Sequence, residues 1–255
     1  FPTRRSSDLS CSSETILLFP VSRFVRFFHN HGLLTIFKQP RWYTVDGGAR
    51  TYVSLMTKEF KDRIRLNCAV KKVERKSQMV VVHDVNGGVQ EFDRVIFACH
   101  ADQALALLDD PSQEERDVLG AFSYQDNHII VHRDISLMPK RKKAWASWVY
   151  MADHNDSVSL SYWMNNLQGL DKRFPIIETL NPATRPPKDM IYDEHHFRHP
   201  IFNQASIAAQ DKLNIIQGSR NCYYCGAWQQ YGFHEDGVRS AVSMLNAMGK
   251  VPAWL

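Results

Sequence analysis

The sequence contains no GxGxxG motif, no internal repeat and no low-complexity segment. The missing motif removes the usual fingerprint of a dinucleotide-binding unit. The ordinary composition excludes disorder, collagen-like repeats and coiled coil as the main architecture.

Long apolar runs are also missing. The most apolar early segment, 15–28, is interrupted by Pro20, Arg23 and Arg26, and it has no cleavage-site signature. We therefore expect a soluble, cytoplasmic protein without a transmembrane segment.

Cysteine and net charge are both low. Five widely spaced cysteines, an odd number, argue against a disulfide framework and for a reducing compartment. The net charge of +4 is spread along the chain, which does not indicate a nucleic-acid partner. The basic run 140–143 is interpreted as a solvated loop rather than a nucleic-acid or lipid contact. We expect a small-molecule substrate, and the sequence does not indicate an oligomeric state.

The chain has 255 residues, of which 44% are hydrophobic, enough for one large globular domain or two small ones. Residues 1–9 look like the translation of a sequencing-library adapter, and we exclude them from the interpretation as an artefact. We accordingly expect the natural protein to begin elsewhere and an N-terminal part to be missing.

Hydrophobic periodicity predicts a strand, a helix, a strand, a hairpin and a buried strand in the first half, which favours a piece of an α/β nucleotide-binding domain. The strands that follow are predicted to form an antiparallel meander. Helices are predicted within 10–40 and at 49–60, 101–108, 111–119 and 236–248; strands are predicted at 64–74, 79–83, 89–92 and 93–99, between 127 and 180, and at 222–225; 198–210 and its flanks look irregular, then helical.

Two glycines, Gly47 and Gly48, precede the helix at 49–60. They indicate either a close approach of the backbone to a phosphate at the helix start or an ordinary tight turn. The residues alone leave both interpretations open.

Two other groups carry potential ligands. Cys222 and Cys225 form a CxxC pair, but a zinc site needs a second pair, and residues three apart in a strand face opposite sides. Glu194, His195, His196 and His199 cluster on a segment without helical spacing, so their geometry is unconstrained. We predict no metal site.

The stretch 226–238 is the most informative. A strand ends at Gly226, a short aromatic loop follows, and a helix begins near Asp236 and Gly237. The start of a helix offers unpaired N–H groups and can stabilise an anion. A carboxylate-capped helix explains the same residues equally well.

Taken in order, the segments 43–53, 92–107, 144–148, 162–170 and 226–238 resemble the C-terminal two-thirds of a flavin-containing amine oxidase superfamily protein, an FAD-dependent oxidoreductase. The sequence also resembles bacterial proteins described as predicted NAD/FAD-binding proteins. The resemblance implies an α/β (α+β mixed) fold, in which a partial FAD/NAD(P)-binding domain is interleaved with an antiparallel-sheet substrate domain. It assigns 41–105 and 216–255 to the FAD domain and 10–40 and 106–215 to the substrate domain.

The resemblance also implies the site residues. Val70 stands where a backbone contact to the adenine is expected, and the closing strand, loop and helix are expected along the rest of FAD. Expected cofactor-binding residues are Gly47, Gly48, Val70, Gly226, Ala227, Asp236, Gly237 and Val238; residues on the substrate side are Trp228, Tyr231 and His234, for which core packing is the alternative.

Two departures from the family pattern matter. Ala227 and Trp228 stand where many relatives have an acidic residue, and the GxGxxG unit is absent. We therefore expect this chain alone to be inactive, although the intact protein transfers a hydride from an organic substrate to the flavin N5. We expect the substrate to be an amine or an unsaturated lipid-like or isoprenoid molecule, and the many apolar and aromatic residues of the expected substrate domain favour the second class. The alternatives are an FAD-dependent desaturase or isomerase and a non-catalytic binding module. The sequence does not identify the catalytic residues.

Overall fold

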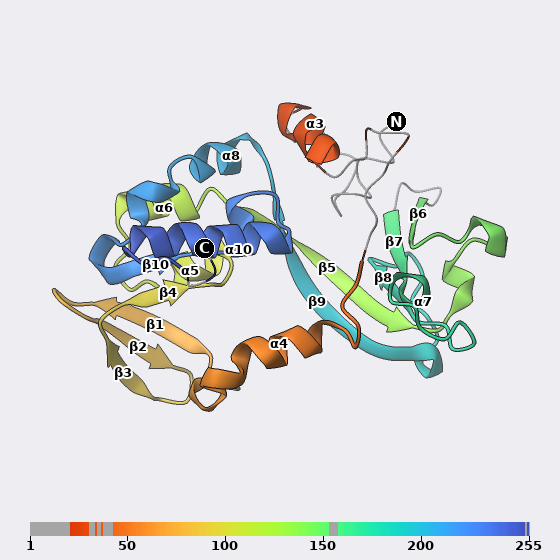
Figure 1. Cartoon of the computed structure of the whole chain (residues 1–255), viewed down its shortest axis with the longest axis horizontal. Helices are drawn as coiled ribbons and strands as arrows, with labels where there is room; N and C mark the ends of the chain where they lie inside the picture. Colours follow the sequence, from red (N-terminus) through yellow and green to blue (C-terminus); the bar gives the residue numbers. More distant parts are fainter. Residues whose placement is uncertain are drawn as a thin grey trace. The chain divides into compact units, whose positions relative to one another are not determined.

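A computed structural model describes residues 21–30, 34, 37, 43–152, 158–252 and 254 (Figure 1). These residues form two compact units. Unit 1 contains Phe28–Lys61 and Tyr124–His199, whereas unit 2 contains Asp62–Ser123, Pro200–Leu255 and most of helix α3 (Val21–Asn30). Each unit is therefore built from segments far apart in the sequence, as expected for interleaved domains.

The unit boundaries differ from the predicted domain boundaries in four places. Residues 43–61 group with the sheet of unit 1, whereas residues 21–27, 106–123 and 200–215 group with unit 2. The assignment of cofactor and substrate to the two units stays a prediction.

Unit 1 is organised around a five-stranded sheet with the strand order β6-β7-β8-β5-β9. The pairs β6–β7, β7–β8 and β5–β8 are antiparallel, which confirms the predicted antiparallel sheet. The predicted meander holds only for β6-β7-β8, because β5 lies between β8 and β9. The strands are β5 (Ser123–His132), β6 (Trp148–Ala152), β7 (Val158–Trp163), β8 (Ile177–Leu180) and β9 (Ile191–Ile201); the helical segments are α4 (Ala49–Thr57), η1 (Lys58–Arg63, which crosses into unit 2), η2 (Ile135–Leu137), η3 (Lys142–Ala144), α7 (Met164–Leu167) and η4 (Lys188–Met190).

The two faces of this sheet bury different side chains because successive residues of a strand point to opposite sides. Ile129, Leu160 and Leu180 form one apolar cluster, with Tyr162 packed against it. Ile177 belongs to the opposite face. Its cluster also contains Met138 and Val149, with Trp145, Met151 and Trp163 at its margin.

A row of polar side chains is buried in the second face. The Thr179 hydroxyl lies 2.8 Å from His132 Nε2 and 2.8 Å from the Ser161 hydroxyl. His132 Nδ1 accepts a hydrogen bond from the backbone N–H of Asp134. Burial lowers the pKa of His132, so its imidazole is neutral at pH 7 and every polar atom of the row has a partner.

Strand β9 corrects the prediction of an irregular segment at 198–210 and its flanks. Residues 191–201 form the outermost strand of the sheet, and helix α8 (Gln204–Gln210) follows, as predicted. The strand was missed because most of its residues are charged, imidazole-bearing or exposed, without apolar alternation. Such polarity is typical of edge strands, since it discourages pairing with another chain.

Unit 2 combines an antiparallel sheet, β1-β2-β3, with a parallel pair, β4 and β10. The predicted hairpin is confirmed: β2 and β3 are joined through Asn86–Gly88, where Gly87 has φ +86°, a conformation that favours glycine. The strands are β1 (Val70–Arg75), β2 (Val80–Asp84), β3 (Val89–Phe92), β4 (Val95–Phe97) and β10 (Cys222–Tyr224); the helical segments are α5 (Ala101–Leu107), α6 (Gln113–Leu119), α8, α9 (Leu213–Ile216), η5 (Ser219–Asn221), η6 (Ala227–Gln229) and α10 (His234–Ala247).

The predicted strand at 64–74 is wrong in its first half. β1 begins only at Val70, and residues 64–69 form a loop in which Asn67 has φ +55°. Asparagine is among the few residues that adopt this left-handed conformation readily, and it ends an extended run. The loop therefore folds back beside the sheet instead of lengthening it.

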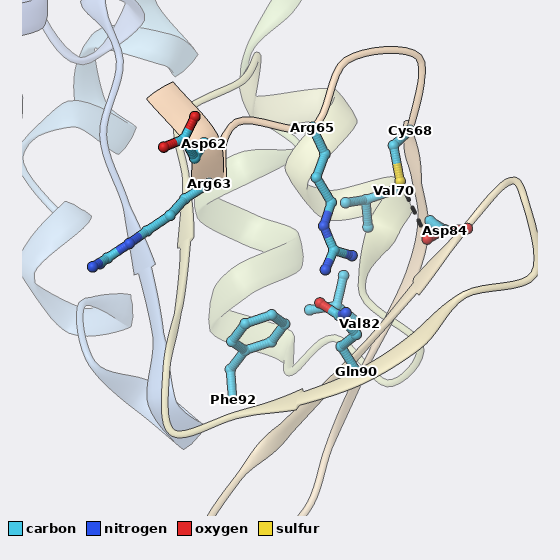
Figure 2. Close-up of a pocket in the computed structure, with 9 residues that line it drawn as sticks. All are labelled: Asp62, Arg63, Arg65, Cys68, Val70, Val82, Asp84, Gln90 and Phe92. Carbon is cyan, nitrogen blue, oxygen red and sulfur yellow. Dashed lines mark hydrogen bonds between the residues drawn. The ribbon is translucent and has the colours of Figure 1, made fainter. Parts of the chain in front are cut away.

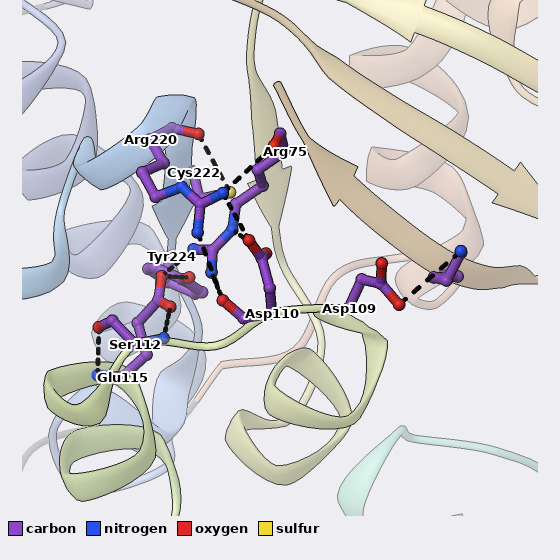
Figure 3. A network of polar contacts seen from close by, with 9 residues as sticks. Arg75, Asp109, Asp110, Ser112, Glu115, Arg220, Cys222 and Tyr224 are labelled. Carbon is purple, nitrogen blue, oxygen red and sulfur yellow. Dashed lines mark hydrogen bonds and ion pairs between the residues drawn. The ribbon is translucent and has the colours of Figure 1, made fainter. Parts of the chain in front are cut away.

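A buried ionic network joins β1, α6 and β10 (Figure 3). Arg75 donates to Glu115 over 2.6 Å and to Asp110 over 3.0 Å, and the Tyr224 hydroxyl donates to Glu115 over 2.8 Å. The side chains of Arg75 and Glu115 are fully buried. Arg220 closes the network through Asp110 at 2.5 Å. Removing one partner of such a pair costs about 3–5 kcal/mol, so the network fixes how these three elements pack.

Burial shifts the ionisation of this network. It raises the pKa of Tyr224, and the adjacent Glu115 carboxylate adds to this effect. Burial opposes the charge on Arg75, but its bonds to Glu115 outweigh that effect and raise the pKa of Arg75. Arg75 is therefore always charged and Tyr224 always protonated near pH 7.

Helix α10 covers the parallel pair. Met244 packs with Tyr223 and Cys225, and Ala241, Leu245 and Met248 complete this cluster. None of the helices in the described ranges is long and apolar enough to cross a membrane.

Candidate functional site

The strand–glycine–helix segment predicted around 226–238 is present in unit 2. β10 ends at Tyr224 and Gly226 follows two residues later. A Cβ atom on Gly226 would lie 2.4 Å from Nε1 of Trp228, so no larger residue fits without moving that indole. The Gly226 N–H donates to the Ser240 hydroxyl over 2.9 Å, which ties the strand end to α10.

Asp236 stabilises the start of α10. Its buried carboxylate accepts hydrogen bonds from the backbone N–H groups of Tyr231, at 3.2 Å, and Phe233, at 3.0 Å. The structure therefore contains the carboxylate-capped helix that was one of the two sequence alternatives. The carboxylate also places a negative charge beside the positive end of the helix dipole, so α10 is not a bare anion-binding terminus.

The other predicted cofactor residues of this segment form a surface of small side chains. A Cβ on Gly237 would meet Ala227 Cβ at 4.0 Å, ordinary van der Waals contact, so loop and helix are close there. Val238, on the first turns of α10, is 51% exposed. Gly226, Ala227, Gly237 and Val238 thus belong to one continuous stretch that a flat molecule could approach.

The three residues expected on the substrate side have different surroundings. Trp228 is only 4% exposed; its ring lies edge-to-face on Phe122, 4.6 Å away, and its Nε1 donates to the Cys99 carbonyl. These contacts are those of a core residue, the alternative that the sequence left open for it. Tyr231 is half-buried in the loop, and His234 is exposed at the first position of α10.

Gly47 and Gly48 form a tight turn in unit 1, before α4. Their φ angles are +78° and +79°, and the Gly48 N–H donates to the Val45 carbonyl over 3.0 Å. A Cβ on Gly48 would touch nothing within 4 Å, so open space lies beside the helix start. All other predicted cofactor residues lie in unit 2.

Val70 lines a pocket of about 550 Å³ in unit 2 (Figure 2). The floor is one face of the β1-β2-β3 sheet, and the wall is the loop that connects η1 to β1. Figure 2 shows Arg65 extending over the sheet face, whereas Arg63 points away from it. The lining residues are Asp62, Arg63, Arg65, Cys68, Val70, Val82, Asp84, Gln90 and Phe92; none of them belongs to the 226–238 segment.

One end of this pocket carries a fixed negative charge. The Cys68 thiol donates to Asp84 over 3.2 Å, and the Gly88 N–H donates to the same carboxylate over 2.9 Å. These bonds lower the pKa of Asp84, and the bond to Asp84 raises the pKa of Cys68. Asp84 is thus an ionised acceptor and Cys68 a protonated thiol at neutral pH.

Sequence reasoning found Val70 but missed the rest of this pocket. Val70, Val82 and Phe92 supply an apolar surface, while Gln90 and Arg65 supply amide and guanidinium groups. A signal was present: alternate residues of the hairpin strands share one face, so Gln90 and Phe92 belong together with Val82. The turn at Asn67, which brings Arg65 over the sheet, could not be predicted from the sequence.

Among the described residues, no further ligand joins the CxxC pair as a metal site. Cys222 and Cys225 are free and buried. Burial raises the pKa of the Cys222 thiol to about 11, and it raises the pKa of Cys225 as well. Both thiols are therefore protonated at neutral pH and are weak nucleophiles.

The acidic and imidazole side chains that cluster on β9 form hydrogen bonds and ion pairs with protein side chains. Glu194 accepts from Arg185 through both oxygens and from His128, and His195 Nε2 lies 2.9 Å from Asp193. In the part of the chain that the structure describes, no three His, Cys, Asp or Glu side chains converge as a metal site.

Known proteins resemble this chain both in a family pattern and in fold. A family described as flavin containing amine oxidoreductase matches residues 6–128. No curated protein matches the sequence. Among solved structures, a putative protoporphyrinogen oxidase from Exiguobacterium sp. shares 12% identity and a TM-score of 0.54, covering 89% of this chain and 57% of its own.

Two further structures share the fold with different chemistry. Putrescine oxidase aligns at 11% identity with a TM-score of 0.51, covering 80% of this chain and 53% of its own. The fatty acid isomerase from P. acnes aligns at 14% identity with a TM-score of 0.50, covering 71% and 47%. The chain thus spans about half the length of the structures it matches. The family match covers residues 6–128, just under half of the chain, and the chain shares the fold of these three structures.

Proposed function

We propose that the protein is an FAD-dependent oxidoreductase that removes a hydride from an organic substrate, and that unit 2 holds the cofactor. When bound, FAD supplies the hydride acceptor. The observation that supports this assignment best is the pocket beside Val70, because its side chains suit the adenine end of that molecule.

The fit is chemical as well as steric. Adenine is flat and apolar on its faces and has donors and acceptors at its edge. Val70, Val82 and Phe92 offer the apolar contact. Gln90 and Asp84 offer acceptors for an exocyclic amine, and the guanidinium of Arg65 suits a phosphate or the ring face. A pocket of about 550 Å³ accommodates a nucleoside.

The 226–238 segment suits the other end of the cofactor. Ala227 has only a methyl group and Gly237 has no side chain, so neither keeps a flat ring from the backbone. Asp236 holds the loop in place through its two N–H acceptor bonds. In this proposal Asp236 is a positioning residue, and Gly226, Ala227, Gly237 and Val238 hold the flavin end.

A second reaction class has a specific observation in its favour. A fatty acid isomerase is among the structures that share the fold, and an isomerase moves a hydride without net oxidation of its substrate. An FAD-dependent isomerase or desaturase is therefore the alternative. It predicts that the flavin returns to its oxidised form without an external electron acceptor.

The test is the affinity for FAD, measured by quenching of flavin fluorescence in the protein expressed from its complete reading frame. Arg65→Ala and Phe92→Ala are each expected to weaken binding about tenfold, the loss of one charged or stacking contact. Arg116→Ala is the matched control, because Arg116 is an exposed arginine of the same unit outside the pocket.

Unchanged affinity in both pocket variants would reject the assignment of the adenine end. Absence of FAD binding by the unsubstituted protein would reject the proposed function as a whole. Thermal unfolding of each variant, followed by circular dichroism, establishes that a weaker affinity is not caused by loss of the fold.

A further inference from the structure

One end of the sheet in unit 1 carries two loops that lie side by side. His132, at the end of β5, and Trp163, at the end of β7, both pair with Ile177, the first residue of β8. The loop from β5 to β6, residues 133–147, and the loop from β7 to β8, residues 164–176, therefore leave the sheet at the same end.

Aromatic contacts join the two loops. The ring of Trp145, in the first loop, lies edge-to-face on Trp163, with 5.1 Å between the ring centroids. Trp145 Nε1 donates to the Pro139 carbonyl over 2.8 Å, which closes residues 140–144 into a turn. From the second loop, Lys172 Nζ lies 4.9 Å from the centroid of the same Trp163 ring, a cation–π contact. The basic residues of both loops are therefore held around one pair of indoles.

The second loop is held in one conformation by Asn165, which is fully buried. Its amide donates to the carbonyls of Asp171 and Phe174, over 2.7 and 2.9 Å, and its oxygen accepts from the Ile176 N–H over 2.7 Å. The Asp171 carboxylate accepts two hydrogen bonds from the Arg173 guanidinium. The charge of Asp171 is thus balanced within the loop and does not neutralise the neighbouring lysine.

The net positive charge of the chain comes from these two loops. Their seven basic and two acidic residues have a net charge of +5, whereas the whole chain has +4, so the remaining residues have −1. The four basic side chains of 140–143 are all exposed. η4 lies at the same end, because the Arg133 N–H donates to the Met190 carbonyl over 2.9 Å, and it adds Lys188 and Asp189, whose charges cancel. Folding thus supplies the wider basic patch that the run 140–143 does not form by itself.

The two loops also expose apolar side chains. Phe174 is 64% exposed, Ile135 49% and Leu170 38%. Nucleic acids bind basic surfaces through phosphates and stacked bases, and aliphatic side chains match neither. The interface of a lipid bilayer suits both kinds of residue, because anionic headgroups attract lysines and the acyl boundary accepts apolar side chains. An anionic membrane therefore fits these loops better than a nucleic acid.

We propose that the two loops dock the protein on the surface of an anionic phospholipid membrane. The basic side chains of 140–143 and Lys172 contact the headgroup phosphates, while Leu170 and Phe174 enter the boundary between headgroups and acyl chains. The inference goes beyond the proposed redox function, since it concerns where the protein acts and uses no residue that lines the pocket beside Val70.

The test is co-sedimentation of the protein, expressed from its complete reading frame, with two kinds of vesicles. One kind contains equal parts of phosphatidylcholine and phosphatidylglycerol, and the other contains phosphatidylcholine alone. We expect binding to the anionic vesicles to be about a hundredfold tighter at low salt, because several basic groups contribute together. High salt is expected to remove most of this preference. Equal sedimentation with both kinds of vesicles, or with neither, would overturn the inference.

Substitutions separate the charged contribution from the apolar one. Lys142→Gln combined with Lys143→Gln is expected to weaken binding to anionic vesicles about thirtyfold, since two charges are removed. Phe174→Ser is expected to weaken it about fivefold at low and high salt alike, because an apolar contact is not screened. Lys212→Gln combined with Lys250→Gln is the matched control, because it removes two exposed lysines of unit 2 and should leave vesicle binding unchanged. Equal losses in the two lysine pairs would show that only the total charge matters, which contradicts a docking surface.

Two further measurements exclude other causes. The thermal unfolding midpoint and the FAD affinity of the Lys142→Gln, Lys143→Gln variant are expected to equal those of the unsubstituted protein, so its weaker vesicle binding does not come from loss of the fold. A single-stranded oligonucleotide is the second probe. A protein that binds this oligonucleotide through Lys142 and Lys143 but does not bind anionic vesicles would show that the loops contact nucleic acid, and the inference would be wrong.

Discussion

Two glutamates of unit 1, Glu178 and Glu194, differ in what surrounds the carboxylate. Glu194 accepts from both guanidinium nitrogens of Arg185 and from His128. These groups lower its pKa to about 2. Glu178 has no such donors, and burial raises its pKa. The neighbours of Glu194 therefore favour its ionised form, whereas burial favours the protonated form of Glu178.

The lowered pKa of Glu194 predicts a specific acid response. Its ionised form is favoured by folding, so its contribution to stability is complete above the unfolded pKa of about 4.3 and is lost as the pH falls toward 2. Over that pH interval, Glu194→Gln should therefore lose less stability than the unsubstituted protein. The measurement is the urea midpoint at a series of pH values for Glu194→Gln and the unsubstituted protein.

Asp189→Asn is the control for this experiment, since its carboxylate is exposed in the same unit. Equal pH dependence in Glu194→Gln and the unsubstituted protein would show that Arg185 and His128 do not stabilise the ionised carboxylate.

At the scale of elements, α10 and the loop before it combine a structural and a proposed cofactor role. Asp236 joins the two through its bonds to the N–H groups of Tyr231 and Phe233. Replacing it by alanine leaves those groups without their acceptor. The expected loss in the free energy of unfolding is about 1–3 kcal/mol, with a smaller loss for Asp236→Asn, which keeps an oxygen acceptor.

Urea unfolding in the absence of FAD measures the contribution of Asp236 to stability separately from any role in cofactor binding. Glu235→Ala is the control, because Glu235 is exposed in the first turn of the same helix. Should Asp236→Ala be as stable as the control, the carboxylate would not hold the loop.

The elements also show what sequence patterns can predict. The β2–β3 hairpin follows from Asn86–Gly88, since a left-handed glycine between two β-branched runs has few other conformations. The strand β9 was missed because its polar residues carry no alternation. The extent of β1 was overestimated because the turn at Asn67 depends on one backbone angle that no periodicity reveals.

At the scale of the whole chain, the contacts that define the units join distant parts of the sequence. Arg75 meets Glu115, and Tyr224 meets the same carboxylate from 109 positions further along. Such pairings cannot be derived from local patterns. The resemblance to a flavoprotein family anticipated the interleaving, but not that residues 106–123 and 200–215 group with unit 2.

The candidate site was likewise predictable in part. The 226–238 segment could be singled out because a strand, a glycine and a helix follow one another directly in the sequence. The pocket beside Val70 could not, since Arg65, Val82 and Phe92 come from a loop and two strands that only folding brings together.

The most direct test of the central claim is the visible spectrum of the protein purified from its complete reading frame, before and after anaerobic addition of a primary alkylamine or an unsaturated lipid. The account predicts the absorbance of oxidised flavin at about 450 nm, with one FAD per chain. It also predicts that an oxidisable organic substrate bleaches this band. A protein without that absorbance, or with a flavin that neither class of substrate reduces, would contradict the account.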